Sequence, residues 1–285
     1  MKRSSRRTLV VAVGVFALVA LATVASADHS WNGYHWARQS NPFTLKVGDN
    51  VNSTWDAHLD IAISDWNQST VLDLTKVAGG TSPKPCRPTS GRIEVCNARY
   101  GNTGWLGIAQ IWVTNGTHIS QAITKLNDYY FDQPQYNTPA WRQLVTCQEI
   151  AHDFGLDHQD ENFNNVNLGS CMDYTNDPDG GPGGASNTDP SNEHPNAHDY
   201  EQLEIIYAHL DNFTTVGQSL VRPLNDRRLT MTHHFQQDDP PSEWGRLIRS
   251  SQDGRLQVFE QDLGRGNKIV RHVFWASSEE RGRDW

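Results

Sequence analysis

The stretch CQEIAHDFGLDHQDE, residues 147–161, decides how this chain is interpreted. Gln148, Glu149 and His152 have the spacing of the HExxH pattern, in which two histidines one helical turn apart bind a cation and the glutamate acts as a base. Glutamine stands here in place of the first histidine. The stretch therefore predicts a hydrolytic metal site and raises the question of what the glutamine does there.

The residues before this stretch predict the helix that would carry the site. Thr138 suits the N-cap and Pro139 the first helical position, so that a helix should run to about Phe154. Gly155 would end the helix and let the chain turn sharply. His158 could then return as a further ligand, and the full pattern is QExxHxxGxxH.

This pattern resembles the signature of the metzincin peptidases, HExxHxxGxxH followed by a turn that contains methionine. The second half is present as SCMDY, with Met172 fourteen residues after His158 and Tyr174 two residues further on. By this resemblance, Met172 would lie beneath the metal and Tyr174 would approach the metal or the substrate oxyanion. Gametolysin-type enzymes, which lyse algal cell walls, are similar in carrying glutamine at the first ligand position, a variant with which copper has been associated.

The resemblance implies a metal-dependent endopeptidase that cleaves extracellular proteins or peptides, with zinc as its cation and Glu149 as general base. The amide oxygen of Gln148 could bind the cation or accept a hydrogen bond from a water bound to it. Because an amide oxygen is a weaker donor than imidazole, zinc affinity should fall, and Cu(II) becomes an alternative. The rival interpretation is a non-catalytic secreted protein that binds metal or protein and has lost its first histidine ligand, although a site without activity has no need of Glu149.

The fold class expected is α+β. Strands are predicted at residues 43–47, 71–77, 92–96, 105–113 and 118–126, with a tight hairpin turn between the last two. Two further helices are predicted, one with Trp55, Leu59, Ile63 and Trp66 on its buried side and one at 196–210 with Tyr200, Leu203, Ile206, Tyr207 and Leu210. By the resemblance, these elements form a twisted mixed sheet. Its antiparallel edge strand would leave backbone groups free for a substrate peptide at Leu106, Gly107, Ile108 and Ala109.

The C-terminal part should be a separate unit. Residues 28–221, the expected peptidase domain, carry 9 basic and 23 acidic side chains, a net charge of 9 − 23 = −14, whereas residues 222–285 carry 11 basic and 10 acidic ones. This change predicts a linker at 222–242, a small antiparallel β-meander at 243–277 and a polar tail at 278–285. An acidic domain argues against nucleic acid or an anionic membrane as partner.

Residues 1–27 have the pattern of a secretory signal peptide. Four basic residues precede an apolar run from Leu9 to Val24, and Ala25-Ser26-Ala27 offers a cleavage site. A membrane anchor is disfavoured because the apolar run is short. We therefore expect an extracellular protein that begins near Asp28, has no membrane association after cleavage, and acts as a monomer.

Four cysteines in an exported chain predict disulfides, and three pairings are conceivable. Cys86 with Cys96 is favoured because it would close a short loop rich in proline and serine. By the metzincin resemblance, Cys147 would pair with Cys171, since the active-site helix and the methionine turn are neighbours in that fold. Loops rich in Asp and Asn at 157–167 and 176–189 could hold calcium, but they lack EF-hand spacing.

Overall fold

One mixed sheet runs through the computed structural model, which describes residues 29–182, 186–218 and 241–277. Within these ranges the sheet has nine strands, of which eight follow the order β3-β2-β4-β6-β5-β9-β8-β7, while β1 pairs with β6 beside this path. The strands are β1 His35–Trp36, β2 Phe43–Asn50, β3 Leu72–Ala78, β4 Ile93–Ala98, β5 Trp105–Thr114, β6 His118–Asn127, β7 Arg246–Ser250, β8 Leu256–Gly264 and β9 Asn267–Trp275. This is the α+β class with a mixed sheet that the sequence predicts.

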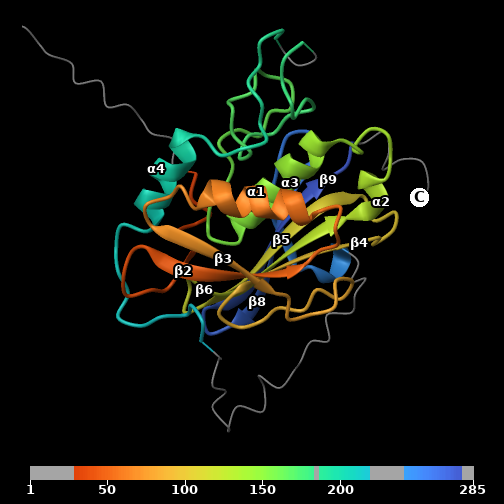
Figure 1. Ribbon diagram of the computed structural model, residues 1–285. Coiled ribbons are helices and arrows are strands. Elements are labelled where there is room, and N and C mark those ends of the chain that lie inside the picture. Colours follow the sequence, from red (N-terminus) through yellow and green to blue (C-terminus); the bar gives the residue numbers. More distant parts are fainter. Residues whose placement is uncertain (1–28, 183–185, 219–240, 278–285) are drawn as a thin grey trace, which may run out of the picture.

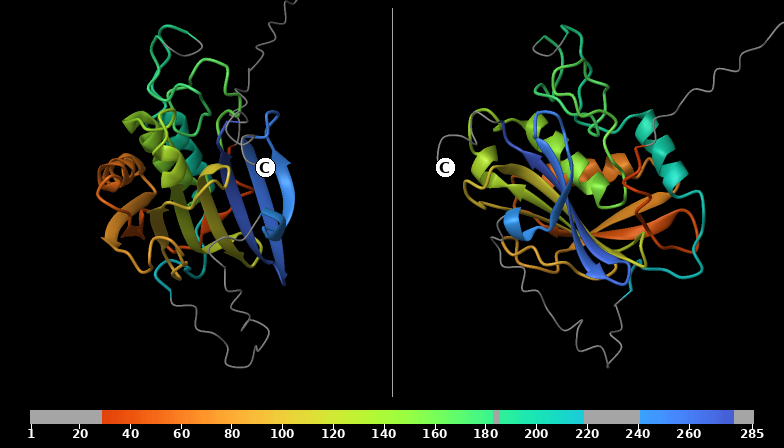
Figure 2. Two further views of the ribbon diagram at one scale, coloured as in Figure 1. Left: turned by 90° about the vertical axis from the view of Figure 1, so that its right-hand side faces the viewer. Right: turned by 180° about the vertical axis from the view of Figure 1, so that it is seen from behind.

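Helices cover one face of this sheet (Figures 1 and 2). They are α1 Asp56–Trp66, α2 Asp128–Phe131, α3 Pro139–His152 and α4 Ala197–Ile206, and a short 3-10 turn spans Pro241–Glu243. The predicted apolar side of α1 is buried, with Leu59 and Trp66 fully inside. The indole Nε1 of Trp66 donates to the carbonyl of Cys147 at 3.2 Å, so α1 fixes the position of α3.

The helix predicted at 196–210 is shorter in the structure, because α4 ends at Ile206. Asn196 caps α4 through its side chain, and Asp199 completes a capping box. The stripe formed by Leu203, Ile206 and Tyr207 is buried, but Leu210 is 57% exposed because the helix has already ended. The prediction for Leu210 is therefore wrong.

The hairpin between β5 and β6 sets the direction of the central strands. β2, β3, β4 and β6 pair in parallel, whereas β5 runs antiparallel to β6. Asn115 and Gly116 at the turn have φ of 53° and 91°, the left-handed region that tight hairpins need. The predicted hairpin is thus confirmed.

The C-terminal strands form the expected antiparallel meander, but they continue the main sheet. β9 pairs with β5 from Trp105 opposite Trp275 to Val113 opposite Lys268, and Figure 2 shows these blue strands completing the sheet. Two expectations are corrected by this finding: the meander is not a separate appendage, and Leu106, Gly107, Ile108 and Ala109 do not lie on a free edge. The physical reason is burial, because Ile269 to Trp275 are all buried, as in a strand covered on both faces.

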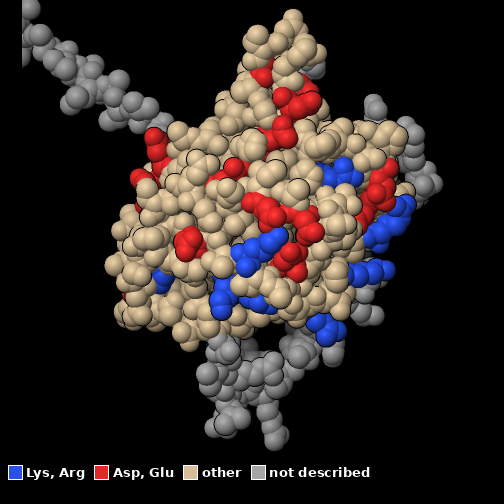
Figure 3. All heavy atoms as spheres, in the orientation of Figure 1, with Lys and Arg blue, Asp and Glu red and all other residues tan. Residues whose placement is uncertain are grey.

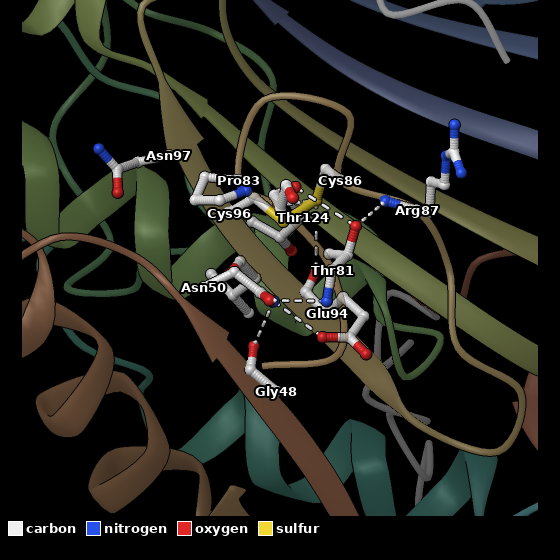
Figure 4. Close-up of a disulfide and its surroundings, with 12 residues drawn as sticks. Gly48, Asn50, Thr81, Pro83, Cys86, Arg87, Glu94, Cys96, Asn97 and Thr124 are labelled. Atoms are coloured by element: carbon white, nitrogen blue, oxygen red, sulfur yellow. Dashed lines mark hydrogen bonds between the residues drawn. A yellow bond between two sulfur atoms is a disulfide. The ribbon is translucent and has the colours of Figure 1, made fainter. Parts of the chain in front are cut away.

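Both expected disulfides are present, Cys86 with Cys96 and Cys147 with Cys171. The first holds a loop against β2 and β4 (Figure 4). In this loop, Thr81 donates its backbone N–H to Asn50 Oδ1 at 3.1 Å, and Asn50 donates to Glu94 Oε2 at 2.8 Å. The loop between β3 and β4 is thereby fixed on the sheet.

Two surface features bear on the expected partners. On the face seen in Figure 3, acidic side chains lie on the projecting loop and over the middle of the molecule, while basic ones gather toward the lower and right-hand edge. No helix in the described ranges is long and apolar enough to cross a bilayer. The expected signal peptide (1–27), residues 222–240 of the linker and the polar tail (278–285) lie outside these ranges.

Candidate metal centre

Helix α3 carries the first part of the predicted site into the interior. The side chain of Thr138 accepts a hydrogen bond from the Trp141 backbone N–H at 3.2 Å, and Pro139 occupies the first helical position, as the sequence predicts. Every residue from Ala140 to His152 is buried. The polar side chains of this helix therefore lie within the protein, where each needs a partner or a ligand.

A glycine turn brings His158 back onto the helix. Gly155 has a φ of 99°, and a Cβ there would stand 2.0 Å from the carbonyl oxygen of Tyr34, so only glycine fits. After this turn the Nε2 atoms of His152 and His158 lie 3.0 Å apart. The structure thus brings together the two histidines that the sequence selects.

The histidine pair suits a bound cation. His152 Nδ1 lies 2.8 Å from the carbonyl of Leu156, which places the proton on Nδ1 and leaves a lone pair on Nε2. Burial lowers the pKa of both histidines, and neutral imidazole is the form that binds metals. Two nitrogens on one tetrahedral zinc are separated by roughly 3.3 Å. The observed separation is within a few tenths of an ångström of that value.

Gln148 points one end of its amide at the methionine turn. Its Nε2 donates to the carbonyl of Cys171 at 3.0 Å. Its Oε1 is buried and has no hydrogen-bond partner among the described residues. A buried acceptor left without a donor is costly, and a cation would satisfy it.

Glu149 lies against β5. The backbone N–H of Ala109 donates to its carboxyl group, while Oε2 is buried without a hydrogen-bond partner in the described part of the chain. A Cβ at Gly107 would stand 2.6 Å from Glu149 Oε1, so the glycine makes room for the carboxyl group. Burial raises the pKa of Glu149 well above its usual value, and the nearby Asp153 carboxyl group raises it further.

The methionine turn, residues 170–174, packs against α3. Met172 is fully buried, and its backbone N–H donates to Ser170 Oγ at 2.9 Å. The disulfide from Cys147 to Cys171 joins the turn to α3. The Tyr174 ring lies 4.3 Å from the His158 ring, and its hydroxyl group is buried with no hydrogen-bond partner among the described residues.

A third histidine, which the sequence pattern does not reveal, reaches the pair from β9. One ring nitrogen of His272 lies within 4.8 Å of ligand atoms of both His152 and His158. By the distances between their ligand atoms, these three histidines are a group that could hold a metal ion. The His272 and His152 rings are stacked 3.8 Å apart, and His272 Nε2 lies 3.5 Å from Asp157 Oδ1. His272 lies on β9, more than a hundred residues after His158, so no ligand spacing in the sequence marks it.

Comparisons with known proteins add little to this geometry. No protein-family model matches the sequence, and a search of characterised proteins finds no relative. Among solved structures, the chain is similar to high choriolytic enzyme 1, a hatching-enzyme zinc protease from the medaka fish Oryzias latipes. The TM-score is 0.35 at 13% identity, over 61% of this chain and 94% of that chain. A superposition this loose assigns neither family nor activity, so the function must be inferred from the residues of the site.

Proposed function

We propose that this protein is a secreted, metal-dependent endopeptidase of the metzincin type that acts on extracellular proteins or peptides. The observation that carries the proposal is the contact between His152 Nε2 and His158 Nε2 at 3.0 Å, one helical turn from the buried carboxyl group of Glu149. The two disulfides support export. Zinc is the cation expected, with copper as the alternative, and calcium in the Asp- and Asn-rich loops stays a prediction.

His152, His158 and Gln148 Oε1 would hold the cation. When bound, it supplies Lewis acidity, which polarises a peptide carbonyl group and lowers the pKa of a water molecule. The positive charge of a bound cation would favour the ionised form of Glu149 against the effect of burial, so that Glu149 takes the proton of the attacking water and passes it to the leaving amine. Tyr174, whose hydroxyl group is buried and has no hydrogen-bond partner among the described residues, would donate a hydrogen bond to the oxyanion.

A second candidate is a non-catalytic binding protein with the same architecture. The observation that favours it is the closure of the site: Gln148, Glu149, His152 and His272 are each at most 1% exposed. In this conformation β9 also occupies the side of β5 on which a peptide would add. Hydrolysis of a peptide therefore requires a change of conformation that opens the site. Binding of a cation alone does not require one.

Metal content and proteolysis of the same preparation separate these candidates. The mature chain, isolated without added metal, should contain zinc or copper and hydrolyse casein. A chelator should abolish this activity, and returning the metal should restore it. Bound metal without proteolysis under any condition favours the second candidate. A chain with no affinity for either metal at His152 and His158 rules out the peptidase.

A further inference from the structure

A second group of ligand side chains lies where β1, the start of β6 and the segment after α4 meet. The Nε2 atoms of His35 and His209 are 3.1 Å apart. His35 Nε2 lies 3.7 Å from Asp211 Oδ2, and His209 Nε2 lies 3.9 Å from Asp211 Oδ1. The ligand atoms of all three residues are within 4.8 Å of one another. This spacing allows one ion to contact all three.

The tautomer of His35 leaves a ligand atom directed at this group. Its Nδ1 lies 2.8 Å from the carbonyl of Gly33, which places the ring proton there and the lone pair on Nε2. Burial lowers the pKa of His35, which favours the neutral ring that binds metals. The side chain of His209 is 51% exposed, which gives an ion a path from solvent.

Arg38 engages only one of the two carboxylate oxygens of Asp211. Arg38 Nη1 donates to Asp211 Oδ2 at 3.2 Å, as does the Arg38 backbone N–H. The other oxygen, Oδ1, faces His118 Nε2 at 3.3 Å and His209. Carboxylates that bind metals are commonly oriented by such neighbours. The Arg38 pair therefore fixes the carboxylate without using both of its oxygens.

We propose that His35, His209 and Asp211 form a second cation site, for Zn²⁺ or another divalent transition metal, with His118 orienting the carboxylate. Two imidazoles and a carboxylate are a suitable donor set for zinc, with water as fourth ligand. The second cation site ties β1 to the segment after α4. Trp31, four residues before His35, contacts His152 and His272 with ring centroids 5.8 and 4.9 Å away, so the same segment reaches both sites.

Zinc stoichiometry of the full mature chain tests this proposal. The protein stripped by chelator and titrated with Zn²⁺ alone should bind one equivalent at the second cation site. In His209→Ala the affinity for this equivalent should fall at least about tenfold. His194→Ala is the matched control, since His194 is also exposed but bonds to Asp65. His158→Ala should remove the equivalent bound at the candidate metal centre. This variant tests the ligands of the proposed peptidase independently of the second cation site. Unchanged zinc affinity and stoichiometry in His209→Ala would overturn the second cation site.

The antiparallel meander of β7, β8 and β9, here called the C-terminal latch, lies against the candidate metal centre. β9 lies antiparallel along β5 from residue 105 to residue 113. Phe274 packs edge-on against Tyr174 with ring centroids 4.7 Å apart. Arg249 of β7 forms ion pairs with Asp157 and Glu161, which flank His158. The latch thus contacts the candidate metal centre through its backbone, an aromatic ring and a cation.

We infer that the C-terminal latch keeps the site latent by occupying the peptide-binding side of β5. This inference rests on the proposed peptidase function. An added peptide strand would need the same backbone N–H and C=O groups of β5 that β9 now pairs with. Release of β9 from β5 is then the activating step, because it opens the strand edge and removes His272 from its stacked position on His152.

A reversible clamp tests the latch in the full chain. Gln110 and Arg271 are opposite one another in the β5–β9 ladder and share a hydrogen bond of 2.6 Å, whereas the adjacent His272 faces the site. The double variant Gln110→Cys/Arg271→Cys should form a disulfide across the two strands. Oxidised, it should hydrolyse casein at least about tenfold more slowly than wild type, and reduction should restore the rate. Wild type given the same reductant controls for the native disulfides.

Arg249→Ala provides the opposite change. Loss of its ion pairs to Asp157 and Glu161 weakens the latch, and we expect hydrolysis to rise severalfold. A clamped protein that cleaves as fast as wild type would overturn the latch but leave the peptidase intact. If wild type, Arg249→Ala and the reduced clamp all fail to cleave although metal is bound, the peptidase proposal fails, and the latch with it.

Discussion

The imidazole rings of His152 and His272 stack with centroids 3.8 Å apart and planes inclined by only 16°. An imidazole lone pair lies in the plane of its ring, so a cation must lie close to the plane of every ring that binds it. Two nearly parallel rings at this distance have no common position in both planes at the roughly 2.0–2.1 Å of a zinc–nitrogen bond. In this conformation His272 therefore covers His152 and does not share its cation.

The variant His272→Ala should separate covering from binding. We expect the zinc affinity of the candidate metal centre to change by less than about tenfold, or about 1.4 kcal/mol. In His158→Ala it should fall by at least about a hundredfold, because a direct ligand is lost. Competition with a chromophoric chelator measures both. If His272→Ala weakens zinc binding as much as His158→Ala, then His272 is a ligand and must turn from its stacked position.

Gln148 can be tested in both directions at one position. Its Oε1, which no described residue satisfies, predicts that Gln148→His raises zinc affinity at least about tenfold, since imidazole is a stronger zinc donor than an amide oxygen. Gln148→Ala should lower the affinity for zinc and copper alike. Isothermal titration with each metal gives the comparison. Equal affinities in all three proteins would show that residue 148 does not contact the cation.

Local patterns account for the predictable part of the fold. Helix α3 has its cap at Thr138 and its proline at Pro139, and Gly155 turns the chain, because each depends on neighbours within a few residues. On its other side, β5 pairs with β9, which lies far along the chain. No local pattern encodes this pairing. The available signal was that apolar residues fall on both faces of β9, Ile269 and Val273 on one and Val270 and Phe274 on the other, which indicates a strand buried on both faces rather than one in an exposed meander.

The candidate site was predictable to a similar extent. His152 and His158 meet because helical spacing and a glycine turn fix their separation. His272 joins them only through strand pairing, and Leu210 is exposed because α4 ends earlier than its apolar spacing indicates. Spacing thus identifies ligands within one segment, whereas a residue contributed by a distant strand needs the tertiary structure.

Glu149→Gln should separate chemistry from metal binding. The amide fills the same space beneath β5 but cannot take a proton from water, so casein hydrolysis should fall by on the order of 10²–10⁴-fold. Metal content should stay equal to that of wild type, because Glu149 is not a ligand in the proposed site. Activity and elemental analysis of one preparation check both points. Wild-type activity in Glu149→Gln would exclude Glu149 as the base.

Asp173 predicts a pH dependence of stability that is independent of the cation. It is fully buried and accepts hydrogen bonds from the Leu168 backbone N–H at 2.8 Å and from Asn192 Nδ2 at 2.9 Å. Burial nevertheless raises its pKa from 3.8 to about 6. The folded state therefore holds this proton more tightly than the unfolded state. The stabilising contribution is complete below about pH 4 and is lost as pH rises through about 6.

The variant Asp173→Asn should remove this dependence. Between about pH 4 and pH 7, the free energy of unfolding of wild type should fall relative to that of Asp173→Asn by at most about 3 kcal/mol, the equivalent of the raised pKa. Urea unfolding at a series of pH values provides the two curves. Asp73→Asn, a change at an exposed aspartate, is the control and should run parallel to wild type. A constant difference between wild type and Asp173→Asn across this range would mean that Asp173 is already ionised in the folded protein at pH 4.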